Sequence, residues 1–190
     1  MSLITHDDQT FTNISYAEKR VEREEFQSCI FKQCDFSNSR FSGDKFLDCT
    51  FINCNLSLMK LPDTTLSNAI FKDCKIMGVI FSECRDFLFS VQFESCQLDY
   101  ASLMNRKMPK TKFIKCSMKD ANFSQANLSG SLFDECDLSG TIFNKTDLSF
   151  TNFTTAYNYS IEPELNNLKK AIFSIHGLGG LLDKYGIKIV

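Results

Sequence analysis

The chain has 190 residues and a formal net charge of −2, so its bulk charge indicates neither a nucleic-acid partner nor a membrane surface. It contains no apolar run long enough to span a bilayer, and its N-terminus has no basic segment followed by an apolar core, so we expect no secretory signal. Nine cysteines without such a signal predict a cytoplasmic protein with free thiols. Phenylalanine occurs 19 times and tryptophan is absent, an imbalance that is unusual for an ordinary core.

Residues 1–25 follow a five-residue spacing of large side chains only in part. Phe11, Tyr16 and Val21 keep the spacing, but the charged residues Lys19 and Glu24 occupy positions that are small further along the chain. The ends of a repeat structure need a cap, because an open edge pairs with other chains. We therefore expect residues 1–25 to form an N-terminal cap.

Residues 26–153 carry the repeat itself. Every fifth residue from Phe26 to Phe81 is large and apolar, and the spacing resumes two residues late at Leu88 and runs to Phe153. The residue two places before each large one is mostly small, and residues two apart on an extended chain share a face. Each unit therefore points one small and one large side chain inward and turns a corner with the rest. A single slip is predicted within 82–87.

Stacking decides how many units close one coil. Reading every fourth unit sorts the chain into uniform columns, which indicates about 20 residues per coil and predicts an all-β, right-handed quadrilateral β-helix. One column of the predicted structural core is entirely phenylalanine: Phe31, Phe51, Phe71, Phe93, Phe113, Phe133, Phe153 and Phe173. Another is entirely cysteine: Cys34, Cys54, Cys74, Cys96, Cys116 and Cys136.

One side of the predicted coil is irregular. Its column of small sites reads Glu24, Asp44, Thr64, Asp86 and Arg106 before it returns to small residues. Two interpretations remain open: a bulged side with its charges bent outward, or a face that contacts a partner. The second interpretation names the following residues as candidates: Arg85, Asp86, Phe87, Phe89 and Arg106.

Surface charge is also unevenly distributed along the repeat. Residues 106–119 are basic and contain no acid, whereas residues 120–153 carry five outward acids against one lysine. Those acids form a candidate partner-binding acidic patch, with an ordinary solvated surface as the alternative: Asp120, Asp134, Glu135, Asp137 and Asp147.

The pattern stops after Phe153, and residues 154–190 read as a C-terminal tail. Residues 157–170 look like an excursion, after which Phe173 rejoins the phenylalanine column, and the last fifteen residues predict a short helix and a final strand. The apolar residues of the tail either cap the rod or join two rods, and we expect a homodimer. The candidate interface residues are Leu178, Leu181, Leu182, Tyr185, Ile187 and Ile189.

Chemistry-bearing motifs are sparse in this sequence. The cysteines contain no CxxC pair and fall mostly at small inward sites, so packing accounts for them and we expect no metal. His6 and His176 lie outside the repeats, and the glycines at 177–180 do not follow a strand in a βαβ context. We expect no cofactor and no enzymatic activity.

The stretches CIFKQCDFSNSRF and ANFSQANLSGSLFDECDLSGTIF resemble the pentapeptide-repeat family, over residues 26–153. Length, cap and tail look like the quinolone-resistance branch of that family. This resemblance implies a dimer that protects DNA gyrase and topoisomerase IV by imitating DNA in shape and negative charge. The net charge of −2 and the basic stretch depart from that pattern. The alternative is a scaffold for another protein; neither hypothesis includes direct contact with nucleic acid or membrane.

Overall fold

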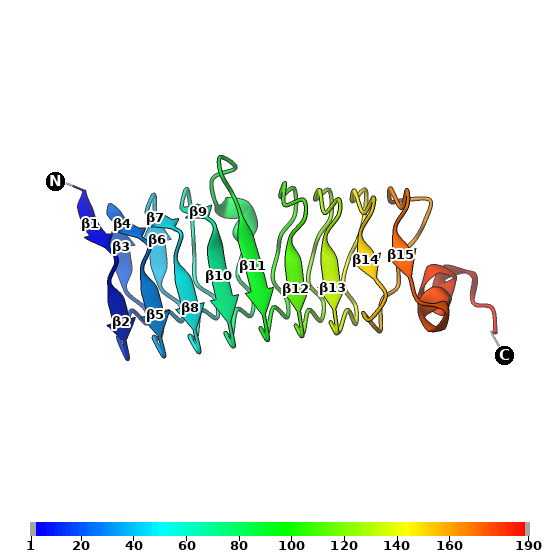
Figure 1. Cartoon of the computed structure of the whole chain (residues 1–190), viewed down its shortest axis with the longest axis horizontal. Coiled ribbons are helices and arrows are strands. Elements are labelled where there is room, and N and C mark those ends of the chain that lie inside the picture. Colours follow the sequence, from blue (N-terminus) through cyan, green and yellow to red (C-terminus); the bar gives the residue numbers. More distant parts are fainter. Residues whose placement is uncertain (1–2, 189–190) are drawn as a thin grey trace.

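The computed structural model describes residues 3–188, which form one rod of stacked coils (Figure 1). All strand pairs in this part of the chain are parallel, and partners lie 20 residues apart, as in Phe31 opposite Phe51, or 22 apart across the slip, as in Phe71 opposite Phe93. The predicted solenoid with about 20 residues per coil is therefore confirmed. No helix among the described residues has the length and hydrophobicity needed to cross a bilayer.

The largest sheet runs the whole length of the rod and forms its nine-strand side (Figure 1). Its strands are short, and each places one residue of the phenylalanine column inward. They are, in chain order, β2 (Thr10–Thr12), β5 (Ile30–Lys32), β8 (Thr50–Ile52), β10 (Ala69–Lys72), β11 (Val91–Glu94), β12 (Lys112–Ile114), β13 (Leu132–Asp134), β14 (Asn152–Phe153) and β15 (Ile172–Phe173).

Three further sides close each coil. The cysteine side follows the nine-strand side and is joined by isolated bridges such as Asp35 to Asn55. The β3 side comes next and holds β3 (Arg20–Glu22) and β6 (Arg40–Ser42). The β1 side completes the coil with four strands: β1 (Ile4–Asp7), β4 (Glu24–Gln27), β7 (Lys45–Leu47) and β9 (Thr65–Ser67).

The corners explain the polar residues of the repeat. Nearly every fifth residue has a positive φ, between 51° and 75°, as at Asn13, Asp48 and Gly43. Asparagine, aspartate and glycine adopt this left-handed conformation most easily, because other side chains crowd the backbone there. Many corners therefore turn with residues that cost little to place, and others, such as Leu58 and Phe150, hold this conformation at a cost.

The lumen is filled by the two predicted columns. Rings of the phenylalanine column stack nearly parallel, with centroids 4.7 to 5.5 Å apart from Phe11 to Phe173. The inward thiols each point at main-chain carbonyl oxygens: Cys54 donates to Phe31 at 3.4 Å and Cys136 to Phe113 at 3.3 Å. Thr146 occupies the same kind of site and donates to Phe123 at 2.9 Å. The cysteine column and Thr146 thus place small hydrogen-bond donors against main-chain carbonyls, whereas other small sites hold residues without a donor, such as Ala121.

The solenoid extends beyond residues 26–153 at both ends. Strands β1 and β2 pair in register with β4 and β5, so the segment expected to cap the rod forms a coil of the same kind. At the other end, Tyr157 bridges Asp137 and Asn167 bridges Asp147, each 20 residues apart. Residues 157–170, expected as an excursion, therefore continue the last coil, because main-chain pairing persists where the side-chain pattern fails.

The slip lies where it was predicted, but the chain re-enters the core one residue later than expected. Cys84 keeps the small site and follows a short 3-10 helix, η1 (Phe81–Glu83). Leu88 is exposed with a φ of 61°, whereas Phe89 is buried and packs edge-on against Phe81 at 6.3 Å. Phe89, not Leu88, is the large residue of this unit, and residues 85–88 form an excursion from the β1 side.

The tail closes the C-terminal end of the rod with two 3-10 helices, η2 (Ile175–Leu181) and η3 (Asp183–Tyr185). Ile161 donates its N–H to Gly180 at 2.8 Å, and a side chain on Gly177 or Gly180 would collide with Tyr159. Residues 187–188 have no regular structure, so the expected final strand is absent up to that point, and Ile189 lies outside the described residues.

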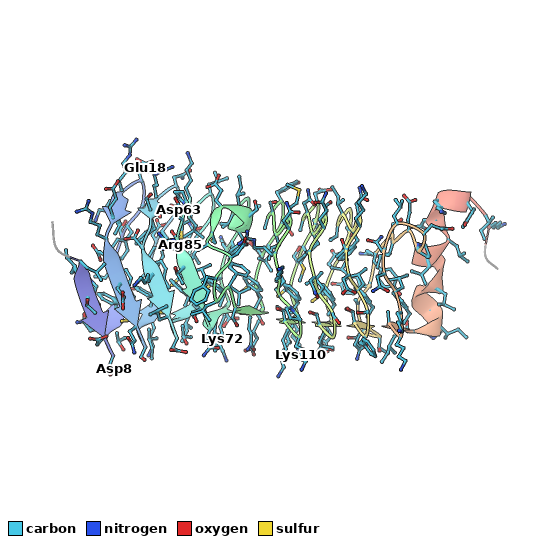
Figure 2. All side chains as sticks on the ribbon, turned by 90° about the horizontal axis from the view of Figure 1, so that it is seen from above. Asp8, Glu18, Asp63, Lys72, Arg85 and Lys110 are labelled. Carbon is cyan, nitrogen blue, oxygen red and sulfur yellow. The ribbon has the colours of Figure 1, made fainter. Side chains whose placement is uncertain are left out.

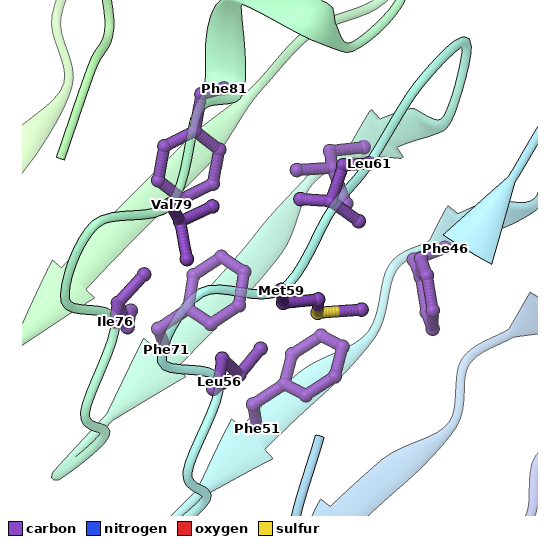
Figure 3. A pocket seen from close by; sticks show the side chains of 10 residues that line it. Phe46, Phe51, Leu56, Met59, Leu61, Phe71, Ile76, Val79 and Phe81 are labelled. Atoms are coloured by element: carbon purple, nitrogen blue, oxygen red, sulfur yellow. The ribbon is translucent and has the colours of Figure 1, made fainter. Parts of the chain in front are cut away.

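One packing defect occurs in the core between the coils of Phe51 and Phe71 (Figure 3). The void has a volume of about 10 Å³ and is lined only by apolar side chains, Leu61 and Leu66 among them. The void lies where the large inward residues of the other three sides change from phenylalanine to smaller residues, while the phenylalanine column continues. With no polar partner on its wall, the void does not hold an ordered water.

Candidate interaction surfaces

The excursion at residues 85–88 is held in place by Arg106. The guanidinium donates to the carbonyl oxygens of Cys84 at 3.0 Å and Ser82 at 3.3 Å, and pairs with the Asp86 carboxylate at 2.6 Å. It also lies over the ring of Phe89, 5.3 Å from its centroid. A buried cation thus fills the space that the excursion leaves in the lumen and replaces the missing main-chain pairing.

This arrangement separates the five residues predicted for the irregular face. Arg106 and Phe89 are buried and present nothing to a partner, so their assignment to a contact surface is corrected. Arg85, Asp86 and Phe87 are exposed. The Phe87 side chain is 76% exposed, more than any other aromatic side chain of the repeat. Lys72 and Lys110 lie along one long edge of the rod, and Arg85 lies away from that edge (Figure 2).

The five predicted acids do not form one patch. Asp134 and Glu135 lie at the corner after the nine-strand side, next to Asp137 on the cysteine side. Asp120 turns the following corner, one coil earlier. Asp147 lies on the β1 side, half a coil from Asp137 and so on the opposite face of the rod. The sequence pattern predicts that these residues point outward. The side of the rod on which each residue lies is seen only in the four-sided structure.

The acids are also partly neutralised by the basic stretch of the preceding coil. Lys115 lies 3.7 Å from Glu135, and Lys119 lies 3.6 Å from Asp137. Burial alone would raise the pKa of Asp137, but hydrogen bonds from Ser139 and Asn158 and the Lys119 charge lower it. Asp137 is thus an ionised, internally paired carboxylate. The basic and acidic segments are adjacent coils of an alternating surface.

The tail both covers the core and exposes apolar surface. Leu181 packs against the core, whereas Leu178, Leu182, Tyr185 and Ile187 are exposed. The Tyr185 hydroxyl donates to Glu164 at 2.7 Å, and Lys184 also pairs with this carboxylate. Five of the six predicted interface residues are therefore described, and four of them face outward at the end of the rod.

Burial disfavours the reactive form of two of the thiols. All nine cysteines are free and buried, and burial raises the pKa of Cys49 and Cys84 to about 12. Thiolates, which are the nucleophiles and metal ligands, are therefore disfavoured at these two sites. No group of three or more metal-ligating side chains occurs within residues 3–188.

Asp44 is a buried acid whose place in the lumen was not predicted from the sequence. Asp44 is fully buried at a small inward site, where one oxygen accepts the Glu24 N–H at 2.7 Å and the other has no partner. Burial raises its pKa to about 6, and the charges of Glu24 and Glu22 add to this. His6 pairs with Glu24 at 3.0 Å and stacks on Phe26.

Comparison with solved structures places this geometry among known proteins. Three structures of QnrB1, described as a plasmid-mediated fluoroquinolone resistance protein, match over almost the whole chain. One trypsin-treated variant gives a TM-score of 0.62 at 16% identity, covering 100% of both chains. Another gives 0.65 at 17%, covering 95% of this chain and all of the other, and the full-length protein gives 0.57 at 16%, covering 96% and 100%.

Sequence comparison gives the family directly. No curated protein sequence matches significantly. Two family models do match: the one described as pentapeptide repeat region over residues 24–103, and the one described as pentapeptide repeats (8 copies) over residues 121–157. Together these segments span more than half of the chain. The chain belongs to the pentapeptide-repeat family and shares the fold of the QnrB1 structures.

Proposed function

We propose that this chain is a non-catalytic, dimeric binding protein that docks on a type II topoisomerase and protects it from fluoroquinolones. The observation that carries the proposal is the end-to-end similarity of the rod to three structures of a fluoroquinolone resistance protein. At 16% to 17% identity this similarity concerns the fold, so the partner must be tested directly.

The excursion is the best-supported contact for such a partner. It is the one place along the repeat where two neighbouring apolar side chains, Phe87 and Leu88, project from a side of the rod, and both are more than half exposed. Arg106 holds the base of the excursion rigidly, which lowers the entropy that binding must overcome. DNA imitation by a continuous acidic patch is supported less well, because Glu135 and Asp137 are paired with lysines.

The exposed tail residues support the dimer. Leu178, Leu182 and Ile187 project from the last turns of the rod, and a second copy meeting them end to end would double its length. Sedimentation of the full chain tests this directly. We expect a dimer at micromolar concentration and a monomer for Leu182→Asp. A monomeric wild-type protein would overturn this part of the proposal.

Supercoiling by DNA gyrase with and without a fluoroquinolone tests the partner. We expect micromolar protein to restore supercoiling in the presence of the drug, and the double variant Phe87→Ser, Leu88→Ser to lose most of that effect. Ile142→Ser, which removes an exposed apolar residue from another side, is the matched control. If the wild-type protein changes neither reaction, for gyrase and for topoisomerase IV, the proposal is wrong and a scaffold for a different protein takes its place.

A further inference from the structure

A row of three cations lies along the outside of the β3 side in the N-terminal half of the rod. Arg20 is in register with Arg40, and Arg40 with Lys60, and all three are exposed. Because neighbouring coils are ~4.8 Å apart, the three charged side chains start within ~10 Å of one another. The next outward position of the same row is Ile80.

The row is not neutralised within the described part of the chain. No ion pair there joins Arg20, Arg40 or Lys60 to a carboxylate. On other sides, opposite charges in neighbouring coils form ion pairs: Lys45 lies 2.8 Å from Glu25, and Lys72 lies 2.9 Å from Glu94. Like charges at directly opposed strand positions destabilise a sheet. The cation row therefore does not serve stability.

The surface around the row is hollowed in two connected places. A depression of about 610 Å³ is lined by the three cations and by Lys19, with Glu18 and Glu22 at its N-terminal end. A second depression of about 310 Å³ shares Asn38 and Lys60 with the first and continues to Ile80, with Glu83 also on its wall. The cation row thus ends at an adjoining depression, which is less polar than the first.

This second hollow has an apolar wall. Leu58 is 54% exposed and holds a φ of 58°, a conformation that is unfavourable for a branched side chain. It lies against Gly78, where a Cβ atom would be 2.8 Å from the Leu58 side chain. Ile80 is 46% exposed beside it. An exposed apolar pair therefore adjoins the third cation, with Leu58 beside Lys60 and Ile80 one coil further.

We propose that the row Arg20, Arg40, Lys60 and Ile80 is a docking groove for an acidic amphipathic helix of another protein. Its carboxylates, at i, i+4 and i+7, face the three cations, and an apolar side chain at i+11 covers Ile80 and Leu58. The helical rise places i and i+7 ~10.5 Å apart, close to the ~9.6 Å of two coil steps. Alternate residues of an extended peptide would span ~13 Å and lose register.

Charge and polarity favour a peptide over a nucleic acid. A phosphate backbone carries a charge at every step and would also meet Glu18 and Glu22 at one end and the apolar pair at the other. An acidic helix has only the charges it needs and brings its own apolar residue. The groove does not depend on topoisomerase binding, since it involves neither the excursion nor the tail.

Fluorescence anisotropy with the full chain tests the groove. The probe is a labelled alanine-based helical peptide with Glu at i, i+4 and i+7 and Leu at i+11, compared with a peptide of the same composition in which these residues are spread around the helix. We expect the aligned peptide to bind at least about fivefold more tightly than the spread one, and more weakly as salt rises. Equal affinity of the two peptides overturns the proposal.

Matched variants locate the site. Removing the three cations, as Arg20→Ser, Arg40→Ser and Lys60→Ser together, is expected to weaken binding roughly tenfold without lowering the denaturant midpoint. The control removes three exposed lysines from the same outward position on the other sides: Lys75→Ser, Lys107→Ser and Lys112→Ser. Ile80→Ser is expected to cost roughly threefold, and Ile142→Ser, equally exposed on the same side, nothing.

Two results would contradict the groove. One is a triple cation variant that binds the aligned peptide as well as the lysine control does. The other is a single-stranded oligothymidylate that displaces the peptide from the wild-type protein at lower concentration than the unlabelled peptide itself, because the cations would then belong to a nucleic-acid surface.

Discussion

The two halves of the rod follow the same five-residue rule but fill the β1 side of the lumen differently. From the N-terminus through residue 106, the small inward sites of this side include the charged residues Asp44 and Arg106, both buried. In the C-terminal half they are Ala126 and Thr146, and the threonine hydroxyl is satisfied by a main-chain carbonyl at 2.9 Å. A charge in the lumen costs free energy unless hydrogen bonds and an opposite charge compensate for its desolvation, and the two buried charges differ in this respect. Arg106 has carbonyls and a carboxylate; Asp44 has one N–H.

The largest expected effect on the free energy of unfolding comes from removing the Arg106 side chain, whose buried charge is compensated. Arg106→Ala removes the donor for the Cys84 and Ser82 carbonyls, leaves Asp86 without its partner and opens a cavity under Phe89. We expect a loss of about 3–5 kcal/mol in the free energy of unfolding, measured by urea denaturation. Lys107→Ala, its exposed neighbour, is the control and should change stability by less than about 0.5 kcal/mol. A loss below about 1 kcal/mol for Arg106→Ala would show that the excursion needs no anchor.

The regular columns could be predicted from sequence because they repeat. Phe31 to Phe153 and Cys34 to Cys136 recur at a fixed interval, so stacking alone assigns each to one side, and the structure confirms both columns. A count of residues also located the slip. It could not show where the chain re-enters, because Phe87, Leu88 and Phe89 are three successive apolar residues and only one fits the lumen.

The departures share a physical cause: main-chain pairing tolerates what the side-chain pattern forbids. Tyr159 and Ile161 are buried in the last coil although the five-residue pattern fails around them. Arg106 reads as a surface residue from its charge, and only the space left by the excursion explains its burial. Which acids share a side was likewise hidden, since Asp137 and Asp147 occupy equivalent positions in units two sides apart.

The second expected effect comes from the uncompensated charge. The pKa of Asp44 is about 6 in the folded chain against an ordinary value of 3.8, so folding favours the protonated carboxyl. Its contribution is fully present below pH 3.8 and is lost as the pH rises through about 6. At pH above 7 the ionised side chain costs about 2–3 kcal/mol. Asp44→Asn keeps an oxygen for the Glu24 N–H without the charge.

Unfolding free energies between about pH 3.5 and 7.5 measure this effect. Asp44→Asn should exceed the wild type at pH 7.5 by about 2 kcal/mol, by roughly half of that at about pH 5, and should match it only below the ordinary value of 3.8. Asp63→Asn, an exposed corner residue on the same coil edge, should leave the pH profile unchanged. Parallel profiles for wild type and Asp44→Asn would mean that the lumen holds Asp44 ionised after all.

The third expected effect concerns the closed end of the C-terminal half. A Cβ atom at Gly180 would lie 2.1 Å from the Tyr159 carbonyl oxygen, so Gly180→Ala must lift η2 from the last coil. We expect a loss of about 2 kcal/mol that is confined to the end of the rod. Hydrogen exchange should accelerate at Ile161, whose N–H is bonded to Gly180, and not at Phe113. Gly186→Ala has open space around its Cβ but is strained locally, because Gly186 has a φ of 59°; this strain lies at the end of η3 and should not accelerate exchange at Ile161.

The smallest expected effect tests the rule that both halves share. Cys54 donates to the Phe31 carbonyl at 3.4 Å, as Thr141 donates to Met118 at 2.7 Å in the other half. Cys54→Ala loses this donor and some volume and should cost about 1 kcal/mol, whereas Cys54→Ser should stay within about 0.5 kcal/mol of the wild type. If alanine is tolerated as well as serine, the cysteine column is selected for volume alone. In that case the donor role belongs only to the hydroxyl sites, such as Thr64 in the N-terminal half and Thr141 in the C-terminal half, and the thiol sites of both halves contribute packing alone.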